Sequence, residues 1–328
     1  MKTPKISILI PTYNYARYLP EALDSILRQD RTDFEVIISD DASSDDTAEI
    51  VAPYTASDPR FHFHRQQKNL GMVANWNWCL QQARGDYIQY LFADDFFIHS
   101  SALSCLAAQL DENPRAGLAV AARRLADDTS RLDITAEDLR RAGIHGGKDA
   151  IRRCLLSGKN LIGEPSVVMF RKALASRGFD DRYKQLVDLE MWFYLCNQAM
   201  LAFIAKPLCA FRQHVAQQTA VNAQDESTRL EMFHLFQTYQ HATGRDETGI
   251  AARLTYYTTL YAIIKGLRRS PLASPEHDEA TRYLQGLIPQ IWLPLAALSY
   301  RIRKQSASLI RSIYKRKTRS GAMRRPDR

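Results

Sequence analysis

The chain has 328 residues, of which 45% are hydrophobic, 24% charged and 10% aromatic, with 14 glycines and 13 prolines. This ordinary globular composition excludes a disordered chain, a collagen-like repeat and a small disulfide-rich scaffold. The formal charge of +8 lies at the end of the chain, because residues 301–328 hold 11 Lys and Arg and one acid, whereas residues 1–300 carry a net charge of −2. The basic tail attracts anionic lipid or nucleic acid, and the near-neutral body argues against a nucleic-acid-binding protein.

The cysteines and the apolar runs bear on the cellular compartment. Five cysteines, an odd number with no C-x-x-C, predict buried free thiols in a reducing compartment. Only five apolar-rich residues precede Pro11, which is too short for a signal peptide, and no window reaches 18 apolar residues. We therefore expect a cytoplasmic protein without a membrane-spanning helix.

The first third of the chain alternates predicted strands and helices. Apolar, β-rich runs predict strands at 6–10, 34–39, 61–64 and 87–92. Helical periodicity, capping residues and a terminating glycine predict helices at 17–28, 46–54 and 72–83. This alternation is typical of βαβ units, so the predicted fold class is α/β, with a Rossmann-like, mainly parallel sheet flanked by helices.

The rest of the chain changes character in two steps. Residues 123–160 are polar and give no clear pattern, and the next segment predicts a strand at 167–170, a helix at 187–197 and a strand at 201–205. Beyond 222 the pattern is helical, with candidates at 225–241, 248–267 and 276–288. We therefore expect an α/β domain over 1–222, a helical C-terminal extension over 223–299 and a basic tail over 300–328.

Two acidic pairs follow predicted strands, Asp40-Asp41 after 34–39 and Asp94-Asp95 after 87–92. The carboxyl ends of parallel strands meet at one edge of the sheet, where open α/β sheets bind ligands. Carboxylates there hold Mg²⁺ or Mn²⁺ or accept hydrogen bonds from a nucleotide, although an Asp in this position also caps a helix. The chain has neither a P-loop nor a G-x-G-x-x-G motif, which disfavours a P-loop kinase and a dinucleotide-dependent dehydrogenase. A diphosphate would then need a cation held by carboxylates.

Four ordered segments together resemble the nucleotide-binding half of the inverting family 2 glycosyltransferases, which have the GT-A fold. They are Ile8–Asn14 (ILIPTYN), Ile37–Thr47 (IISDDASSDDT), Asn69–Gly71 (NLG) and Gly85–Asp95 (GDYIQYLFADD). The resemblance covers residues 5–120 well and extends loosely to about 220. It implies a hexosyltransferase of the kind that builds bacterial polysaccharide or lipopolysaccharide.

The resemblance implies roles for the matching residues of the first half. It implies a nucleotide-binding set consisting of Pro11, Thr12 and Tyr13 around the base, Asp41 accepting from the base N3–H and Asp94 on the ribose. It implies that Asp95 ligates the divalent cation, Mn²⁺ or Mg²⁺. Phe92 stands where many members have a further Asp, which leaves the division of roles between Asp94 and Asp95 open.

The second half supplies the predicted base. Val187–Leu195 resembles the acidic motif of the family that precedes an apolar helix, which implies Asp188 as the general base, with Glu190 as the alternative. The residues alone also fit a helix N-terminus, with Asp188 as its cap and Glu190 as a first-turn acid. Segment 211–219 resembles a Tyr-Arg-x-His stretch of relatives, which implies that Arg212 and His214 lie near the diphosphate or the metal.

The acceptor and tail complete the predicted function. In relatives the residues near 163–166 shape the acceptor pocket, which implies Glu164 and Ser166 as acceptor-binding residues. Glu190 is also assigned to acceptor binding. Trp76 and Trp78 are expected to pack rather than to hold a sugar. Apolar residues among the basic ones of 300–317 favour contact with an anionic membrane at the inner face of the plasma membrane, with a solvated tail as the alternative.

We therefore expect a metal-dependent inverting glycosyltransferase. Its expected donor is a UDP-sugar, and its expected acceptor is a saccharide or lipid-linked glycan of cell-surface polysaccharide biosynthesis, with no nucleic-acid partner. A nucleotidyltransferase acting on sugar phosphates and a catalytically silent nucleotide-sugar-binding protein are the alternatives.

Overall fold

The computed structural model describes residues 3–127, 130, 132–136, 139, 141–214, 227–242, 249–269 and 274–305. The chain divides into two compact units, one of residues 1–154 and 159–231 and the other of 155–158 and 232–328. The predicted domain boundary at 222 and residues 306–328 of the predicted tail lie outside the described residues. The division into three parts therefore stays a prediction.

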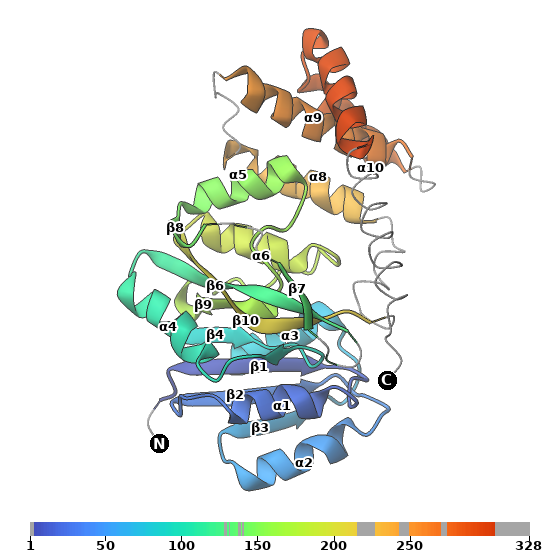
Figure 1. Cartoon of the computed structure of the whole chain (residues 1–328). Helices are drawn as coiled ribbons and strands as arrows, with labels where there is room; N and C mark the ends of the chain where they lie inside the picture. Colours follow the sequence, from blue (N-terminus) through green and yellow to red (C-terminus); the bar gives the residue numbers. More distant parts are fainter. Residues whose placement is uncertain are drawn as a thin grey trace, which may run out of the picture. The chain divides into compact units, whose positions relative to one another are not determined.

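The first unit is built on a mixed sheet with the strand order β3-β2-β1-β4-β9-β6-β10-β5, in which β7 pairs with β6 and β8 with β10 (Figure 1). The strands are β1 Ile6–Thr12, β2 Phe34–Asp40, β3 Phe61–Arg65, β4 Tyr87–Tyr90, β5 Phe96–Phe97, β6 Ala116–Ala126, β7 Leu132–Ala136, β8 Gly143–His145, β9 Val168–Arg171 and β10 Met200–Arg212. β3, β2, β1 and β4 run parallel, and β10 runs parallel to β6. β9 lies antiparallel between β4 and β6. The predicted α/β class with a mainly parallel sheet is confirmed.

Helices flank this sheet because their apolar faces cover its buried strands. The helices that begin in the first unit are α1 Leu19–Leu27, α2 Thr47–Ser57, α3 Met72–Gln82, α4 Ala102–Glu112, α5 Gly147–Ser157, α6 Val187–Cys196 and α8 Ser227–Tyr239. Every residue of β1 and β2 is buried, which explains why their sequences are continuous apolar runs rather than alternating ones. α1 buries Leu19, Leu23 and Ile26 on one face, as its helical spacing predicts.

The predicted elements of residues 6–90 are present with small shifts at their ends. The strand predicted at 87–92 ends at Tyr90, and Ser166 Oγ accepts a hydrogen bond from Phe92 N at 3.1 Å. The strand predicted at 201–205 is much longer, because β10 continues through register shifts near Pro207 and pairs with β6 as far as Arg212. Residues 102–122, which have no predicted element, form α4 and most of β6, and the polar segment 123–160 contributes β7, β8 and α5.

The second unit is helical in its described part. It contains α9 Ile250–Leu267, α10 Pro275–Gly286 and a helical segment at 293–305. Ser274 caps α10, since its side chain accepts from His277 N. The predicted helices at 248–267 and 276–288 match α9 and α10. Across the described residues, no helix has the length and hydropathy that a membrane crossing requires.

Candidate active site

A cavity of about 400 Å³ lies at the carboxyl ends of β1, β2 and β4. Because these strands are parallel and adjacent, the residues that follow them converge on this edge of the sheet. The cavity is lined by seven of the residues singled out in the sequence, namely Pro11, Thr12, Tyr13, Asp41, Asp94, Glu164 and Asp188. The other five, Asp95, Ser166, Glu190, Arg212 and His214, do not line it.

Asp41 organises the end of the cavity next to β1 and β2. Its backbone N–H donates to Thr12 O at 2.9 Å, which joins the two strand ends. Its carboxylate accepts from Leu70 N at 2.7 Å and from Gly71 N at 3.0 Å, which fixes the turn before α3. Thr12 Oγ1 is buried and has no hydrogen-bond partner among the described residues. A ligand in this part of the cavity would therefore meet an unsatisfied hydroxyl group.

The Asp94-Asp95 pair is split between the cavity and the protein interior. Asp94 lines the cavity, whereas Asp95 is 1% exposed and lies behind it. Asp95 Oδ2 accepts from Ser166 Oγ at 2.5 Å, and Oδ1 accepts from Arg212 N at 3.0 Å. Burial and the neighbouring Asp94 raise the pKa of Asp95 well above its usual value. In this structure Asp95 is thus held by Ser166 and Arg212 behind the cavity, and the roles implied for Asp95 and Ser166 stay predictions.

His214 lies directly beside Asp94. Its Nε2 is 3.1 Å from Asp94 Oδ2, and its ring packs against Tyr18, with 4.8 Å between ring centroids. His214 Nδ1 is buried without a hydrogen-bond partner in the described part of the chain. The described residues contain no group of three or more His, Cys, Asp or Glu able to hold a metal. A carboxylate oxygen and an imidazole nitrogen are nevertheless ligands that suit Mn²⁺, and cations at nucleotide sites take their other ligands from phosphate and water.

Arg212 is occupied by the protein and faces away from the cavity. Its Nε donates to Asp94 O at 2.9 Å, one terminal nitrogen donates to Asp127 O at 2.9 Å, and the other pairs with Glu21. Its side chain is almost completely buried. These contacts fix the backbone that carries Asp94, and the implied approach of Arg212 to the diphosphate stays a prediction.

Asp188 lies at the start of α6 and lines the cavity from the side of the second half of the chain. Its Oδ1 accepts from Leu189 N at 2.7 Å, and its Oδ2 accepts from Asn160 Nδ2 at 3.1 Å. Desolvation, assisted by the negative charge of Glu164, raises the pKa of Asp188 to about 7. A carboxylate with such a pKa is suited to accept a proton near neutral pH.

Two residues that sequence reasoning missed hold Asp188 in place. Asn160 Oδ1 accepts from Gly163 N at 2.9 Å, so the amide that contacts Asp188 is itself fixed. Glu231 on α8 accepts from the backbone N–H groups of Lys184, Gln185 and Leu186, at 2.8–3.3 Å. It thereby fixes the turn that leads into α6. Neither residue belongs to a recognisable motif, and Glu231 is more than 40 residues from the turn it binds.

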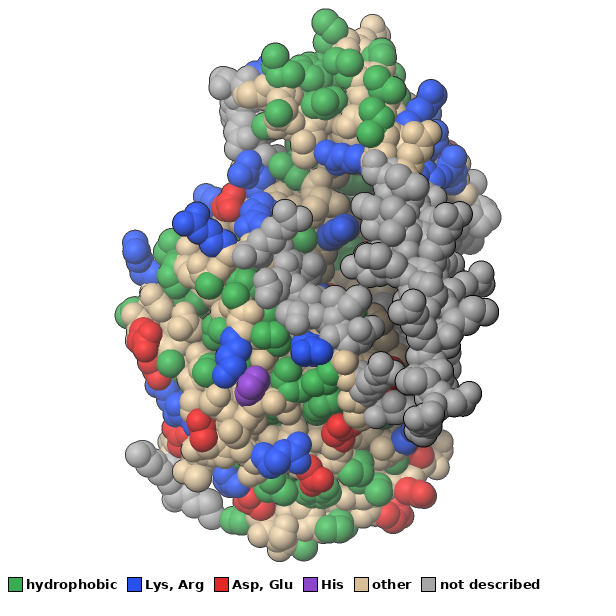
Figure 2. Space-filling view, in the orientation of Figure 1, with side chains coloured by type: hydrophobic (Ala, Val, Ile, Leu, Met, Phe, Trp, Pro, Cys, Tyr) green, Lys and Arg blue, Asp and Glu red, His purple; other side chains and the backbone are tan. Residues whose placement is uncertain are grey.

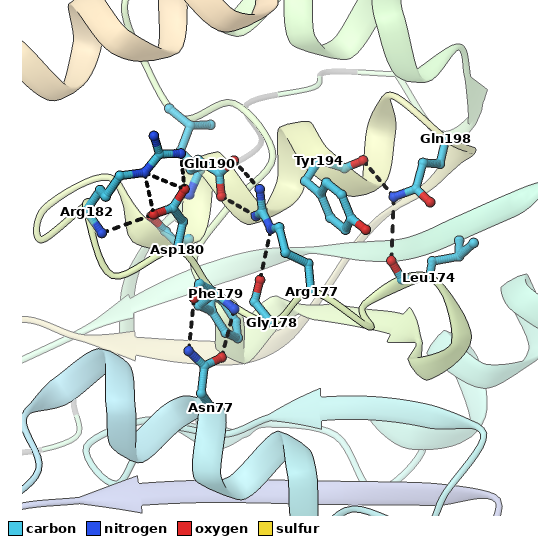
Figure 3. Close-up of polar contacts among 12 residues, drawn as sticks. Asn77, Leu174, Arg177, Gly178, Phe179, Asp180, Arg182, Glu190, Tyr194 and Gln198 are labelled. Atoms are coloured by element: carbon cyan, nitrogen blue, oxygen red, sulfur yellow. Dashed lines mark hydrogen bonds and ion pairs between the residues drawn. The ribbon is translucent and has the colours of Figure 1, made fainter.

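Glu190 differs from Asp188 although both belong to the same motif. It is buried, and Arg177 Nη1 and Nη2 donate to its two oxygens at 2.9 and 2.5 Å (Figure 3). The Arg177 guanidinium also lies 4.1 Å from the centroid of the Tyr194 ring. This bidentate ion pair assigns Glu190 to the support of α6 and offers no acceptor contact.

The cavity combines an acidic lining with an aromatic wall. Four of its lining residues are acids, Asp41, Asp94, Glu164 and Asp188, and among the described lining residues Lys184 alone is a Lys or Arg. An anionic group entering this cavity would therefore meet more acidic than basic side chains. Trp76 and Phe92 line the same cavity with 4.8 Å between their ring centroids, so Trp76 both packs and faces the ligand space.

The chain was compared with protein families and with individual relatives. The model of the family described as "Glycosyl transferase family 2" matches residues 7–179. An uncharacterized protein of Mycobacterium tuberculosis is 36% identical over 226 residues, 66% of this chain and 69% of its own. The GalNAc(5)-diNAcBac-PP-undecaprenol beta-1,3-glucosyltransferase of Campylobacter jejuni is 40% identical over 110 residues, 33% of this chain and only 35% of its own.

Solved structures match nearly the whole chain at low sequence identity. TarS 1–349 of Staphylococcus aureus, in complex with UDP-GlcNAc, has a TM-score of 0.62 at 15% identity and covers 92% of both chains. The mannosyltransferase PcManGT from Pyrobaculum calidifontis, in complex with GDP-Man and Mn²⁺, has a TM-score of 0.55 at 17% identity, covering 92% of this chain and 88% of its own. These matches show the fold, which is of the GT-A type. Because the family model covers more than half of its residues, the chain belongs to glycosyltransferase family 2.

Proposed function

We propose that this family 2 glycosyltransferase moves a sugar, with inversion, from a UDP-linked donor to a saccharide or lipid-linked glycan of cell-surface polysaccharide biosynthesis, with the help of Mn²⁺ or Mg²⁺. The observation that carries the proposal is one cavity that contains Asp94, beside His214, and Asp188. The bound UDP-GlcNAc of TarS and the GDP-Man and Mn²⁺ of PcManGT support the donor and the metal. The undecaprenol-linked substrate in the name of the Campylobacter relative supports the acceptor.

The proposed mechanism assigns the donor to the carboxyl edge of the sheet. Thr12, Tyr13 and Asp41 bind the base, and the diphosphate lies toward Asp94, His214 and Lys184. Asp94 would hold the cation, with His214 beside it at 3.1 Å to orient its carboxylate. When bound, the cation would neutralise the diphosphate as it departs. The proposal assigns the metal to Asp94, which lines the cavity, rather than to Asp95, which the resemblance implies.

Asp188 acts on the acceptor in a single displacement. Its carboxylate takes the proton of the acceptor hydroxyl while that oxygen forms a bond to the anomeric carbon. The bond between the anomeric carbon and the phosphate oxygen breaks on the opposite face, and the nucleoside diphosphate leaves with the electron pair. Attack opposite the leaving group inverts the anomeric configuration. Asn160 and Glu231 keep Asp188 in place during this step.

The products distinguish the proposal from its alternatives. With UDP-GlcNAc as the probe donor, Mn²⁺ and a mixture of bacterial lipid-linked glycans, the protein should release UDP. Pyrophosphate release would indicate a nucleotidyltransferase. Binding of UDP without turnover with any acceptor would indicate a silent nucleotide-sugar-binding protein.

The raised pKa of Asp188 predicts a pH dependence. Below a pKa of about 7 the carboxyl is protonated and cannot accept a proton, so kcat/KM should fall about tenfold per pH unit toward acid and reach a plateau above about pH 8. The hydrogen bond from Asn160 favours the charged form of Asp188, so Asn160→Ala should move this limb to higher pH. The check is the pH profile of UDP release for both proteins, and a wild-type profile that is flat from pH 5.5 to 8.5 would contradict the role of Asp188.

We also propose that the second unit contacts an anionic membrane surface. Ile291, Leu298 and Ile302 of its last described segment are 79%, 55% and 54% exposed. Arg301 and Arg303 lie beside them, and the sequence from 306 to 328, outside the described residues, adds eight more Lys and Arg. Figure 2 shows hydrophobic side chains gathered on the surface of the second unit, with Lys and Arg nearby. Apolar and basic side chains together favour the interface of an anionic bilayer.

Vesicle binding tests this location. Deletion of 301–328 should weaken binding to phosphatidylglycerol-rich vesicles at least tenfold, since each basic residue near such a surface contributes about 1 kcal/mol. The double change Leu298→Ser and Ile302→Ser should weaken it as well, and wild-type binding should fall as salt rises. Cosedimentation measures both effects, with neutral phosphatidylcholine vesicles as the control. Equal binding of all three proteins to the anionic vesicles would rule out the membrane role.

A further inference from the structure

A second hollow of the first unit lies against α3, between that helix and the loop at 177–181. Its volume is about 550 Å³. Residues of α3 divide between the two hollows, because Met72, Asn75 and Trp76 line the cavity whereas Ala74, Asn77, Trp78 and Gln81 line this groove. We call it the Trp78 groove.

Lining residues of the Trp78 groove and of the cavity are neighbours in the chain at two places. Leu70 lines the groove, and the residue that follows it, Gly71, lines the cavity. On the other side, Asp181 lines the groove, and Lys184, three residues later in the same loop, lines the cavity. Phe179 of the groove packs edge-on against Trp76 of the cavity, with 5.2 Å between centroids. The two hollows are therefore neighbours at Leu70–Gly71 and along the loop at 181–184.

The loop wall of the Trp78 groove is fixed by paired contacts. Asn77 Nδ2 donates to Phe179 O at 2.9 Å, and Phe179 N donates to Asn77 Oδ1 at 2.7 Å, so helix and loop are joined (Figure 3). Gly178 lies at φ +75°, and a Cβ there would be 2.6 Å from Asn77 Oδ1, so only glycine fits. Arg182 and Asp180 form an ion pair in the same loop. A wall formed before the ligand arrives reduces the ordering cost of binding.

The aromatic and polar groups of the Trp78 groove suit a saccharide. The Trp78 ring stacks on His64, with 4.5 Å between centroids, which holds the indole in one orientation. The exposed amide of Gln81 and carboxylate of Asp181 have no hydrogen-bond partner in the part of the chain that the structure describes. An aromatic ring with hydrogen-bonding groups around it complements a pyranose, which has an apolar C–H face and hydroxyls at its edge. Asp180 and Arg177 of the lining are paired with Arg182 and Glu190, which leaves Asp181 as an exposed acid that disfavours an anionic group.

We propose that the Trp78 groove binds the sugars of the acceptor glycan that follow the one attacked in the cavity. The proposal rests on the proposed glycosyl transfer and specifies its acceptor as a chain of several neutral sugars. Trp78 supplies the stacking surface, and Gln81 and Asp181 hydrogen-bond the hydroxyls. This role for Trp78 goes beyond the packing expected from the sequence, which its contact with His64 agrees with.

Binding of the full chain to an array of immobilised bacterial surface oligosaccharides and monosaccharides tests the proposal. The wild type should retain at least one neutral oligosaccharide and not its terminal monosaccharide. Trp78→Ala should weaken that binding about tenfold, Trp78→Phe should weaken it less, and Gln81→Ala should weaken it measurably. Gln82→Ala, on an exposed neighbour of the same helix outside the groove, is the matched control and should bind as the wild type does.

UDP binding with Mn²⁺, measured on the same proteins, separates this proposal from the proposed function. If UDP binds but no oligosaccharide is retained, or if Trp78→Ala and Gln81→Ala bind glycan as the wild type does, the groove proposal is overturned and the donor site stands. If UDP does not bind to the wild type, the proposed function itself fails. Gln81→Ala keeps the test decisive even where Trp78→Ala does not fold.

Discussion

Replacement of Asp188 by asparagine should lower the rate of glycosyl transfer by about 10²- to 10⁴-fold, the usual contribution of a general base. Asparagine has almost the same shape and keeps a side-chain oxygen for the hydrogen bond from Asn160, but it cannot take up the acceptor proton. UDP binding in the presence of Mn²⁺ should stay near the wild-type level, because the nucleotide lies toward β1, β2 and Asp94. Steady-state release of UDP, together with titration of UDP, measures the two effects separately.

The same substitution should also stabilise the protein at high pH. The folded-state pKa of Asp188 is raised to about 7, so between roughly pH 4 and 7 the folded state binds more protons than the unfolded state. The free energy of unfolding of the wild type therefore falls as pH rises through this window, and Asp188→Asn removes that loss. Glu190→Gln is the control, since it breaks the ion pair with Arg177 and should lower stability. Full transfer activity in Asp188→Asn would exclude Asp188 as the base.

Replacement of Asp94 by alanine should abolish the metal dependence of UDP binding. Asp94 is the carboxylate of its pair that lines the cavity, so its loss removes the proposed protein ligand of the cation. Without it the cation bridge to the diphosphate is lost, and UDP affinity with Mn²⁺ should fall at least tenfold, toward the value measured with EDTA. Calorimetric titration of UDP with Mn²⁺ and with EDTA gives both values.

Asp95→Asn is the matched control for this experiment. Asp95 points away from the cavity and is held by Ser166 and Arg212, so the amide should preserve most of the metal-dependent affinity. The assignment of the metal to Asp94 is contradicted if Asp94→Ala keeps the response to Mn²⁺ and Asp95→Asn loses it. That result would restore the role implied by the sequence resemblance.

The strands and helices of the first half of the fold can be predicted from the sequence because the strands are buried on both faces. β1 and β2 are continuous apolar runs. The helices between the parallel strands instead repeat their apolar residues with the period of a helix. The strands of the second half are harder to predict from the sequence, for physical reasons. β7 and β8 have only five and three residues, too few to show a period. β10 follows β6 through register shifts near Pro207, which no local sequence pattern predicts.

The candidate site, like the fold, could be predicted from the sequence only in part. The strand order places Asp41 and Asp94 at one edge, so their convergence follows from the parallel sheet. The direction of each side chain does not follow from sequence. The resemblance implies a metal contact for Asp95 and an acceptor or base role for Glu190, and in the structure their carboxylates bind Ser166 and Arg177. Glu231 was missed because its contact with the turn before α6 joins segments far apart in the chain.

Thermal unfolding with UDP, in the presence and absence of Mn²⁺, is the most direct test of the central claim that an acidic cavity binds a nucleoside diphosphate through a divalent cation. At a UDP concentration 100 times the dissociation constant, binding should stabilise the folded state by about 2.7 kcal/mol, which raises Tm by about 5–10 °C for a domain of this size. With EDTA in place of Mn²⁺ the shift should be close to zero. No shift with UDP and Mn²⁺, or an equal shift in EDTA, would contradict the account.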